Sequence, residues 1–314
     1  MNTIRAVVVD PTVPGRLTLQ EVPHPIPQPQ QAVVRVSALS LNRGEVRRSL
    51  SADAGWRPGW DLAGVIETAA ADGSGFPTGT RVVGFLSSGA WAELVCVPTH
   101  SLAEIPDSVS FAIASTLPVA GLTALLALER GGLLLGKSIL ITGASGGVGH
   151  AACQLAHHAG AKVIAHIRRL ELIDFVKAAG AEEVVVGDDI SAAAQYEYDL
   201  ILDSVGGNTL TTALNLLAKD GTCVIFGTTS GAEITFNASR FYGKGGLSLY
   251  GFILFHELEK QPASFGLKKL VNLVAEGSLR PHIDLEAPWT QVAEIAQQLT
   301  DRQFVGKAVL HISN

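Results

Sequence analysis

The chain has 314 residues, of which 47% are hydrophobic and 17% are charged, so it can bury a large core and is long enough for two domains. A net charge of −6 gives no basic footprint for nucleic acid, and no apolar run approaches the roughly 18 residues of a membrane span. Three scattered cysteines without C-x-x-C spacing, and no signal-peptide pattern, predict a cytoplasmic protein with reduced thiols.

Residues 1 to about 112 predict a compact, mostly β module. Short β-branched runs alternate with breaks rich in proline and glycine, which is typical of strands joined by turns. The strands expected here include Arg5–Val9, Ala32–Val36, Gly64–Thr68 and Arg81–Phe85.

From Ser115 to about Phe255 the pattern alternates between strand and helix, which predicts a doubly wound parallel sheet. The strands expected are Ile139–Thr142, Lys162–Ala165, Glu183–Val186, Leu200–Asp203, Thr222–Gly227 and Ser248–Leu254. The tail predicts helices near Ser264–Glu276 and Thr290–Leu299 and a last strand, Gly306–His311.

A dinucleotide site is predicted where the strand that begins at Ser138 turns into a glycine-rich loop and then a helix near Val148–His158. Aligned on the G-x-G-x-x-G pattern, Ala144 takes the first glycine position, Gly146 lets the backbone approach a pyrophosphate, and Gly149 permits close packing of helix on strand. The alternative is a tight turn without a ligand. The cofactor contacts expected from this loop are Ala144, Ser145, Gly146, Gly147 and Val148.

The residues after the second strand favour NADPH over NADH. An NAD site would place an acid there for the ribose 2′-hydroxyl, whereas this chain has Arg168 and Arg169. Two planar guanidinium groups suit a 2′-phosphate because each can bind it with two hydrogen bonds. The alternative is that both arginines are the solvated start of the next helix.

Several segments, taken in their order and spacing, resemble the medium-chain dehydrogenase/reductase superfamily, and specifically its zinc-independent quinone oxidoreductase branch. Besides the glycine loop, these segments are Ser40–Asn42, Pro58–Gly64, Gly79–Val83, Gly89–Glu93, Leu117–Ala124, Asp203–Gly206 and Gly306–Leu310. The resemblance implies an α/β fold. A GroES-like, mostly β catalytic domain at residues 1–114, completed by 256–314, would carry an inserted Rossmann domain at residues 115–255.

The resemblance also bears on metal binding. At or near the positions where zinc-dependent relatives carry ligands, this chain has Asn42, Trp60 and Val119, with Asp61 as the acid. A catalytic zinc needs three protein ligands from Cys, His or carboxylates. We therefore predict that no metal is bound.

Without a metal, the chemistry expected is hydride transfer from NADPH to a quinone or an α,β-unsaturated carbonyl. Asn42 is the first catalytic and cofactor-binding candidate, because its amide can bind the nicotinamide ribose or a substrate oxygen; the alternative is an asparagine that shapes a turn. Tyr242 is the candidate proton donor, with Tyr250, His256 and solvent as alternatives.

Further cofactor contacts are expected from residues near the ends of buried segments. They are Thr123, which resembles a family threonine near the nicotinamide, and Gly227, Thr228, Thr229 and Phe252. A purely structural role is the alternative for each, and Asp203 is expected to orient backbone rather than transfer protons.

The apolar run Ser248–Phe255 predicts an edge strand that joins two subunits, so we expect a homodimer; the alternative is an edge covered by the following helix. Two other functions stay open. One is an NADPH-binding redox sensor or interaction protein with little turnover, and the other is an enoyl-thioester reductase.

Overall fold

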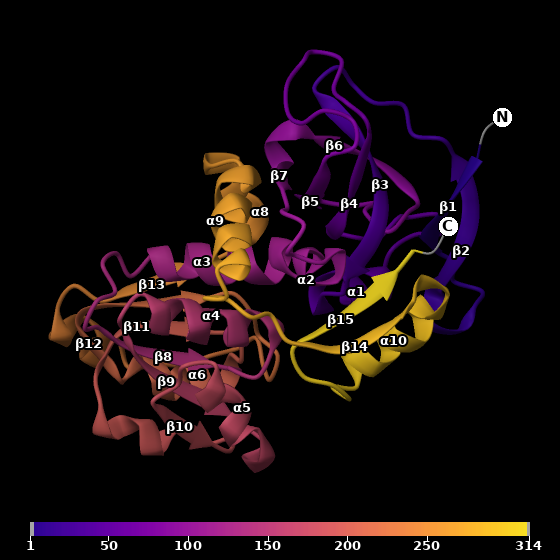
Figure 1. Ribbon diagram of the computed structural model, residues 1–314. Helices are drawn as coiled ribbons and strands as arrows, with labels where there is room; N and C mark the ends of the chain where they lie inside the picture. Colours follow the sequence, from indigo (N-terminus) through magenta and orange to yellow (C-terminus); the bar gives the residue numbers. More distant parts are fainter. Residues whose placement is uncertain (1–2, 313–314) are drawn as a thin grey trace. The chain divides into compact units, whose positions relative to one another are not determined.

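The backbone passes from a mainly β unit into an α/β unit and back again in the computed structural model, which describes residues 3–312 (Figure 1). The first unit runs to Leu122 and resumes over Leu258–Gly277 and from Pro281 onward. The second unit comprises Thr123–Glu257 and Ser278–Arg280.

The first unit is built on a seven-stranded sheet with the order β14-β15-β3-β4-β5-β7, in which β6 also pairs with β3, and on a separate β1-β2 pair. Its strands are β1 (Thr3–Val9), β2 (Leu17–Pro23), β3 (Gln31–Ser40), β4 (Asp61–Thr68), β5 (Arg81–Phe85), β6 (Leu94–Pro98), β7 (Leu102–Glu104), β14 (Ile283–Pro288) and β15 (Lys307–His311). Its helices are α1 (Arg43–Ser49), α2 (Phe111–Ser115), α9 (Ala263–Ala275) and α10 (Val292–Thr300), with a short π-helical turn at Leu117–Gly121.

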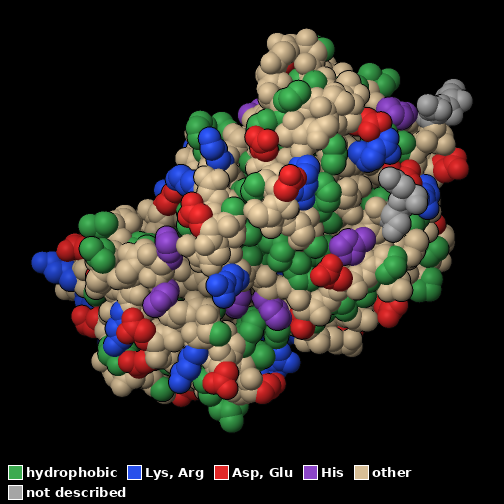
Figure 2. Space-filling model, viewed as in Figure 1, with side chains coloured by type: hydrophobic (Ala, Val, Ile, Leu, Met, Phe, Trp, Pro, Cys, Tyr) green, Lys and Arg blue, Asp and Glu red, His purple; other side chains and the backbone are tan. Residues whose placement is uncertain are grey.

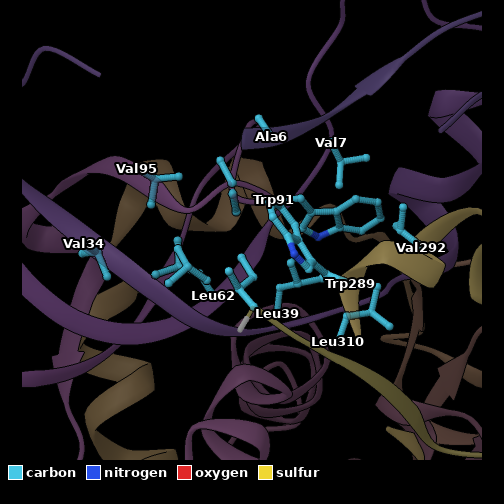
Figure 3. Packing of buried hydrophobic residues seen from close by; sticks show 14 of the residues in the cluster. Ala6, Val7, Val34, Leu39, Leu62, Trp91, Val95, Trp289, Val292 and Leu310 are labelled. Carbon is cyan, nitrogen blue, oxygen red and sulfur yellow. The ribbon is translucent and has the colours of Figure 1, made fainter. Parts of the chain in front are cut away.

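The core of this unit is apolar and comes from both ends of the chain. Trp91 is fully buried and Trp289 nearly so, and they lie among side chains from β1, β3, β4 and β15 (Figure 3). Strand β15 pairs antiparallel with the end of β3, with Val309 opposite Ser40. The last strand of the chain therefore completes a sheet whose strand β3 lies near the start of the chain.

The second unit contains strands β8 (Ser138–Thr142), β9 (Lys162–Ile167), β10 (Glu183–Val186), β11 (Tyr198–Asp203), β12 (Leu217–Ile225) and β13 (Ser248–Gly251). Its helices are α3 (Leu122–Glu129, whose first residue belongs to the first unit), α4 (Gly147–His158), α5 (Ile173–Ala178), α6 (Gly207–Leu214) and α7 (Ala238–Lys244). Helix α8 (Leu254–Lys260) begins in this unit and ends in the first.

All six strands of this unit pair in parallel, in the order β10-β9-β8-β11-β12-β13. Numbered from β8, that order is 3-2-1-4-5-6, so the doubly wound sheet expected from the sequence is confirmed. The order reverses between β8 and β11, and ligands of such sheets bind at the carboxyl ends of the strands at this reversal.

The strand boundaries differ from the prediction at the edge of this sheet. The expected strand Ser248–Leu254 ends at Gly251, and α8 already begins at Leu254; Phe252, between them, is buried. The predicted strand at Thr222–Gly227 instead begins earlier, at Leu217. Strand β13 does lie at the edge, paired with β12 on one side.

The composition predicts neither a basic surface patch nor a membrane-spanning helix. On the face shown in Figure 2, acidic and basic side chains are interspersed rather than gathered by sign. Among the described helices, none combines the length and apolar character needed to cross a membrane.

Candidate functional site

The glycine loop connects β8 to α4 at the reversal of the strand order. Gly143 has φ of 65°, a conformation that favours glycine, and it turns the chain out of the strand. Ala144 is fully buried and donates its N–H to His166 O at 3.0 Å, which ties the loop to the end of β9. The first amides of α4 have no intrahelical acceptor and carry its positive dipole end.

Two close approaches explain the later glycines of the loop. A Cβ on Gly149 would lie 2.4 Å from Gly143 O and 2.7 Å from Ala144 Cα, so only glycine lets α4 pack this near to β8. A Cβ on Gly146 would lie 3.4 Å from the same oxygen and would add a methyl group to the open face of the turn. This bare backbone fits a pyrophosphate, as the sequence predicts.

Two cations lie beside this loop. Thr142 pairs with His166 in the parallel register of β8 and β9, so Arg168 and Arg169 follow directly at the same edge of the sheet. Both side chains are exposed, and Arg169 Nε lies 3.6 Å from Glu171 Oε1. His166 is buried, with Nε2 2.7 Å from Gly187 O, and burial lowers its pKa.

The loop Gly227–Thr229 lies on the other side of the glycine loop. Asp203, at the end of β11, accepts from Thr142 Oγ1 at 2.7 Å and from Gly206 N at 2.8 Å, and burial raises its pKa. Asp203 thus orients backbone, and Thr229 donates its hydroxyl to Ser204 O at 3.1 Å. A Cβ on Gly227 would lie 2.9 Å from the same oxygen, so the two loops are in close contact.

A second polar cluster lies in the first unit, around the N-terminus of α1. Asn42 precedes the helix and forms a capping box with Glu45: its backbone N–H donates to Glu45 Oε1 at 2.7 Å, and its side chain accepts from the Glu45 backbone. Asp61, the first residue of β4, is fully buried and accepts from Ser40 Oγ at 2.6 Å and from Val119 N at 2.9 Å. Lys307, the first residue of β15, reaches the same place.

The Asn42 amide is held by three charged or ionisable side chains. Its Nδ2 donates to Asp61 Oδ2 at 2.7 Å and to Glu45 Oε1 at 2.9 Å. Its Oδ1 accepts from Lys307 Nζ at 2.6 Å, and Nζ also donates to Leu41 O at 2.8 Å and lies 3.3 Å from Asp61 Oδ2. Burial and the neighbouring Asp61 charge raise the pKa of Glu45 well above its usual value.

The positions aligned with metal ligands therefore do come together. Asn42, Asp61 and Val119 are joined by hydrogen bonds, and the Trp60 ring lies over α1, 2.7 Å from where a Cβ on Gly44 would be. The arrangement holds an ammonium group against Asp61, and positive charge there opposes a metal ion. Among residues 3–312, no three His, Cys, Asp or Glu side chains form a group that could hold a metal.

Three other candidates lie apart from these clusters or inside the protein. Tyr242 is 75% exposed on α7, a helix whose end is fixed by a 2.6 Å bond from Lys244 Nζ to Leu217 O, at the amino end of β12. The amino ends of the strands lie on the opposite side of the sheet from the carboxyl ends, where the glycine loop is. The geometry therefore does not support Tyr242 as proton donor, and the assignment stays a prediction. Thr123 and Phe252 are both buried, and Phe252 N donates to Ile225 O at 2.8 Å.

Lys307, Glu45 and Ser40 were not among the predicted site residues. Glu45 had a signal, because Asn42-x-x-Glu45 is a capping-box spacing. Lys307 had a weaker one, a charge at the start of an apolar strand. Neither pattern indicates that these residues meet Asp61.

Comparisons with known proteins agree with both units. Family models match over residues 147–267 (Zinc-binding dehydrogenase) and 28–107 (Alcohol dehydrogenase GroES-like domain). The chloroplast envelope quinone oxidoreductase homolog of Arabidopsis thaliana is 30% identical, over 92% of each chain. The synaptic vesicle membrane protein VAT-1 homolog-like of Mus musculus is 28% identical, over 95% of this chain and 78% of that protein.

A solved structure shows the same architecture. The quinone oxidoreductase from Coxiella burnetii aligns over 99% of this chain and 100% of its own, with a TM-score of 0.85 and 26% identity. The expected resemblance and fold class are thereby confirmed. The chain is an oxidoreductase of the medium-chain dehydrogenase/reductase superfamily and belongs to its quinone oxidoreductase branch.

Proposed function

We propose that this oxidoreductase uses NADPH and passes a hydride to a quinone or an α,β-unsaturated carbonyl without a metal ion. The observation that carries the proposal is the bare backbone cradle between β8 and α4, with two exposed guanidinium groups at the end of the neighbouring β9. When bound, NADPH supplies the hydride from C4 of its nicotinamide, and the protein supplies binding and orientation.

The second unit would hold the phosphates of the cofactor. The backbone from Ala144 to Val148 would bind the pyrophosphate, since it offers helix N-terminal amides and no side chain at Gly146. Arg168 and Arg169 would bind the 2′-phosphate by charge-assisted hydrogen bonds. The loop Gly227–Thr229 would follow the cofactor along the carboxyl edge of the sheet, with Thr123 and Phe252 as further candidate contacts.

The first unit would contribute Asn42. Both N–H groups of its amide are already donated, to Asp61 and Glu45, and Oδ1 accepts from Lys307 Nζ and, in the capping box, from the Glu45 backbone. Of the two roles predicted for this amide, binding a ribose hydroxyl, which would donate to Oδ1, would need one of these bonds to open. Binding a substrate oxygen would need an N–H that is not available in this arrangement.

The proton for the acceptor would come from solvent. Tyr242 lies toward the opposite edge of the sheet from the glycine loop, so its predicted catalytic role is the weaker proposal. The cytoplasmic location is also a proposal, which rests on the three free cysteines, Cys96, Cys153 and Cys223.

The proposed reaction is tested by the rate of NADPH oxidation with a panel of quinones, enones, enals and enoyl thioesters. Turnover with quinones or enones and not with enoyl thioesters is the expected result. A preference for thioesters would make the protein an enoyl-thioester reductase. Tight NADPH binding without turnover on any acceptor would instead favour the redox-sensor function.

Cofactor choice is tested by Arg168→Ala. Losing one charge-assisted phosphate contact costs about 1.5–3 kcal/mol, so NADPH affinity should fall roughly ten- to a hundredfold while NADH affinity stays nearly constant. Titration calorimetry measures both. Arg240→Ala, on the exposed helix α7, is the matched control. Equal NADH and NADPH affinity in the unmodified protein would contradict the assignment.

Metal independence is tested by exhaustive chelation. The rate of NADPH oxidation should not change, for two reasons. The Lys307 ammonium already neutralises Asp61, and the side chains of Asn42, Trp60 and Val119 do not bind zinc. Elemental analysis should find no stoichiometric zinc. One tightly held zinc per chain, with activity lost on its removal, would refute this part of the proposal.

The assembly we propose is a homodimer joined at β13. Phe252 N–H faces β12, so by the alternation of strand N–H groups Leu249 N–H faces the open edge. Leu249→Pro removes this edge donor without touching the β12 ladder and should yield a monomer by light scattering. Leu249→Ala keeps the N–H and should remain dimeric. A monomeric unmodified protein at micromolar concentration would contradict the proposal.

A further inference from the structure

A pocket of about 320 Å³ lies at the amino edge of the parallel sheet, within the second unit. It is lined by the ends of α6 and α7 and by the loop that precedes α7. Helix α6 ends at Leu214, just before β12 begins at Leu217, and α7 ends at Lys244, just before β13 begins at Ser248. The glycine loop follows the carboxyl end of β8, so the pocket is separate from the candidate dinucleotide site.

The floor of the pocket is apolar. Leu214 is buried, and Phe241 and Leu247 pack against the core cluster to which Leu214 belongs. Phe236 is 40% exposed, and its ring centroid lies 5.4 Å from that of Phe241, with the two planes inclined by 59°. These side chains offer aliphatic and aromatic surface to the pocket. Such a floor favours an apolar ligand body over water.

The exposed rim of the pocket offers hydrogen-bond donors. Asn237 precedes α7, and its side-chain oxygen accepts from Arg240 N at 3.1 Å. This cap uses the oxygen of the amide and leaves Nδ2, with its two N–H groups, as the free end. Arg240 is also exposed, and within residues 3–312 no hydrogen bond or ion pair occupies its guanidinium. Both free groups donate, so they suit a ligand group that only accepts.

The charges at the pocket favour an anion. The Lys244 ammonium donates to Leu217 O at 2.6 Å and to Glu197 Oε1 at 2.7 Å, so its charge is already paired, whereas that of Arg240 is not. Among the described residues that line the pocket, none is acidic. The planar guanidinium fork matches the two oxygens of a carboxylate. The volume is at the low end of the range for small-molecule sites.

We infer that this pocket is a second binding site of the protein and that it takes a small carboxylate with an apolar body. The carboxylate lies at the rim and accepts from the Arg240 guanidinium and from Asn237 Nδ2. The apolar body lies on the floor, against Phe236 and Phe241. The site is independent of the proposed function, because it uses no residue of the candidate dinucleotide site.

The ligand class is tested with two probes that share an apolar body and differ in the head group, 3-phenylpropionate and 3-phenylpropan-1-ol. Dissociation constants for the full chain are measured by ligand-observed NMR. The carboxylate should bind at least roughly tenfold more tightly than the alcohol, because its hydrogen bonds are charge-assisted.

Two rim variants test the contacts with the head group. Asn237→Asp keeps the cap on α7, because Asp accepts from Arg240 N as Asn does, but it replaces the free amide nitrogen with a negatively charged group. Asn237→Asp and Arg240→Gln should each weaken 3-phenylpropionate binding by roughly tenfold, without weakening that of the alcohol. Lys219→Gln is the matched control, since it removes an exposed cation of the same unit outside the pocket, and it should leave both affinities unchanged.

Two further variants locate the site. Gly243 lines the pocket, and a Cβ there would meet nothing within 4 Å, so Gly243→Leu places a side chain in open space. This variant should block both probes and keep the Tm of the unmodified protein. Arg168→Ala removes a cation beside the glycine loop and should leave 3-phenylpropionate affinity unchanged.

Four results would overturn the inference. They are no binding of 3-phenylpropionate at millimolar concentration, equal affinity for the two probes, unchanged affinity in Asn237→Asp, and a loss of affinity in Arg168→Ala. The last result would place the carboxylate beside the glycine loop instead. Each leaves the proposed function intact, since none of these measurements involves NADPH.

Discussion

The buried carboxylate of Asp61 is the constraint on which the first unit depends. It accepts hydrogen bonds from β3 through Ser40, from the start of α1 through Asn42 and from the π-helical turn through Val119, and it pairs with β15 through Lys307. A buried charge that loses its partner costs about 3–5 kcal/mol. All four segments must therefore be placed so that each can bond to Asp61. The same placement fixes the orientation of the Asn42 amide.

The second unit rests on a different constraint, the contact of backbone with backbone. Helix α4 lies against the end of β8 because Gly149 has no side chain, and the same absence of side chains leaves the turn open to a ligand. The second unit thus has a bare backbone turn with exposed arginines beside it, whereas the Asn42 amide of the first unit is held by hydrogen bonds.

The sequence predicts those parts of the fold whose signals are local. The glycine loop and the alternation of strands and helices follow from adjacent residues, and their bounds agree with the structure to within a few residues, except at Leu217. The sequence predicted that β13 continues to Leu254, three residues too far. An apolar residue such as Phe252 is compatible both with a strand and with a buried position after it, and only the tertiary structure decides between them. Strands β2, β6, β7 and β14 were not identified, since their pairing partners, rather than their own short runs, define them.

The candidate site was predictable only in part, because sequence patterns indicate local motifs and not contacts between distant residues. Asn42 and Asp61 were found because they lie in recognisable segments. No local pattern, however, shows that both N–H groups of the Asn42 amide donate to carboxyl groups. Lys307 stands 265 residues from Asn42 and 246 from Asp61, and no periodicity relates residues that far apart. Contacts of this kind are set by the closing of a sheet between distant strands.

The place of Lys307 in the chain has a consequence for the order of folding during synthesis. Strands β3 and β4 leave the ribosome early, whereas the counter-ion of Asp61 arrives with β15, after the whole second unit has been made. Domains generally fold as units as they emerge, so the second unit, whose sheet is contiguous in sequence, can form first. Until β15 is synthesised, the nascent first unit carries the Asp61 carboxylate without the Lys307 ammonium. The polar cluster around Asp61 can therefore be completed only after the second unit has been made.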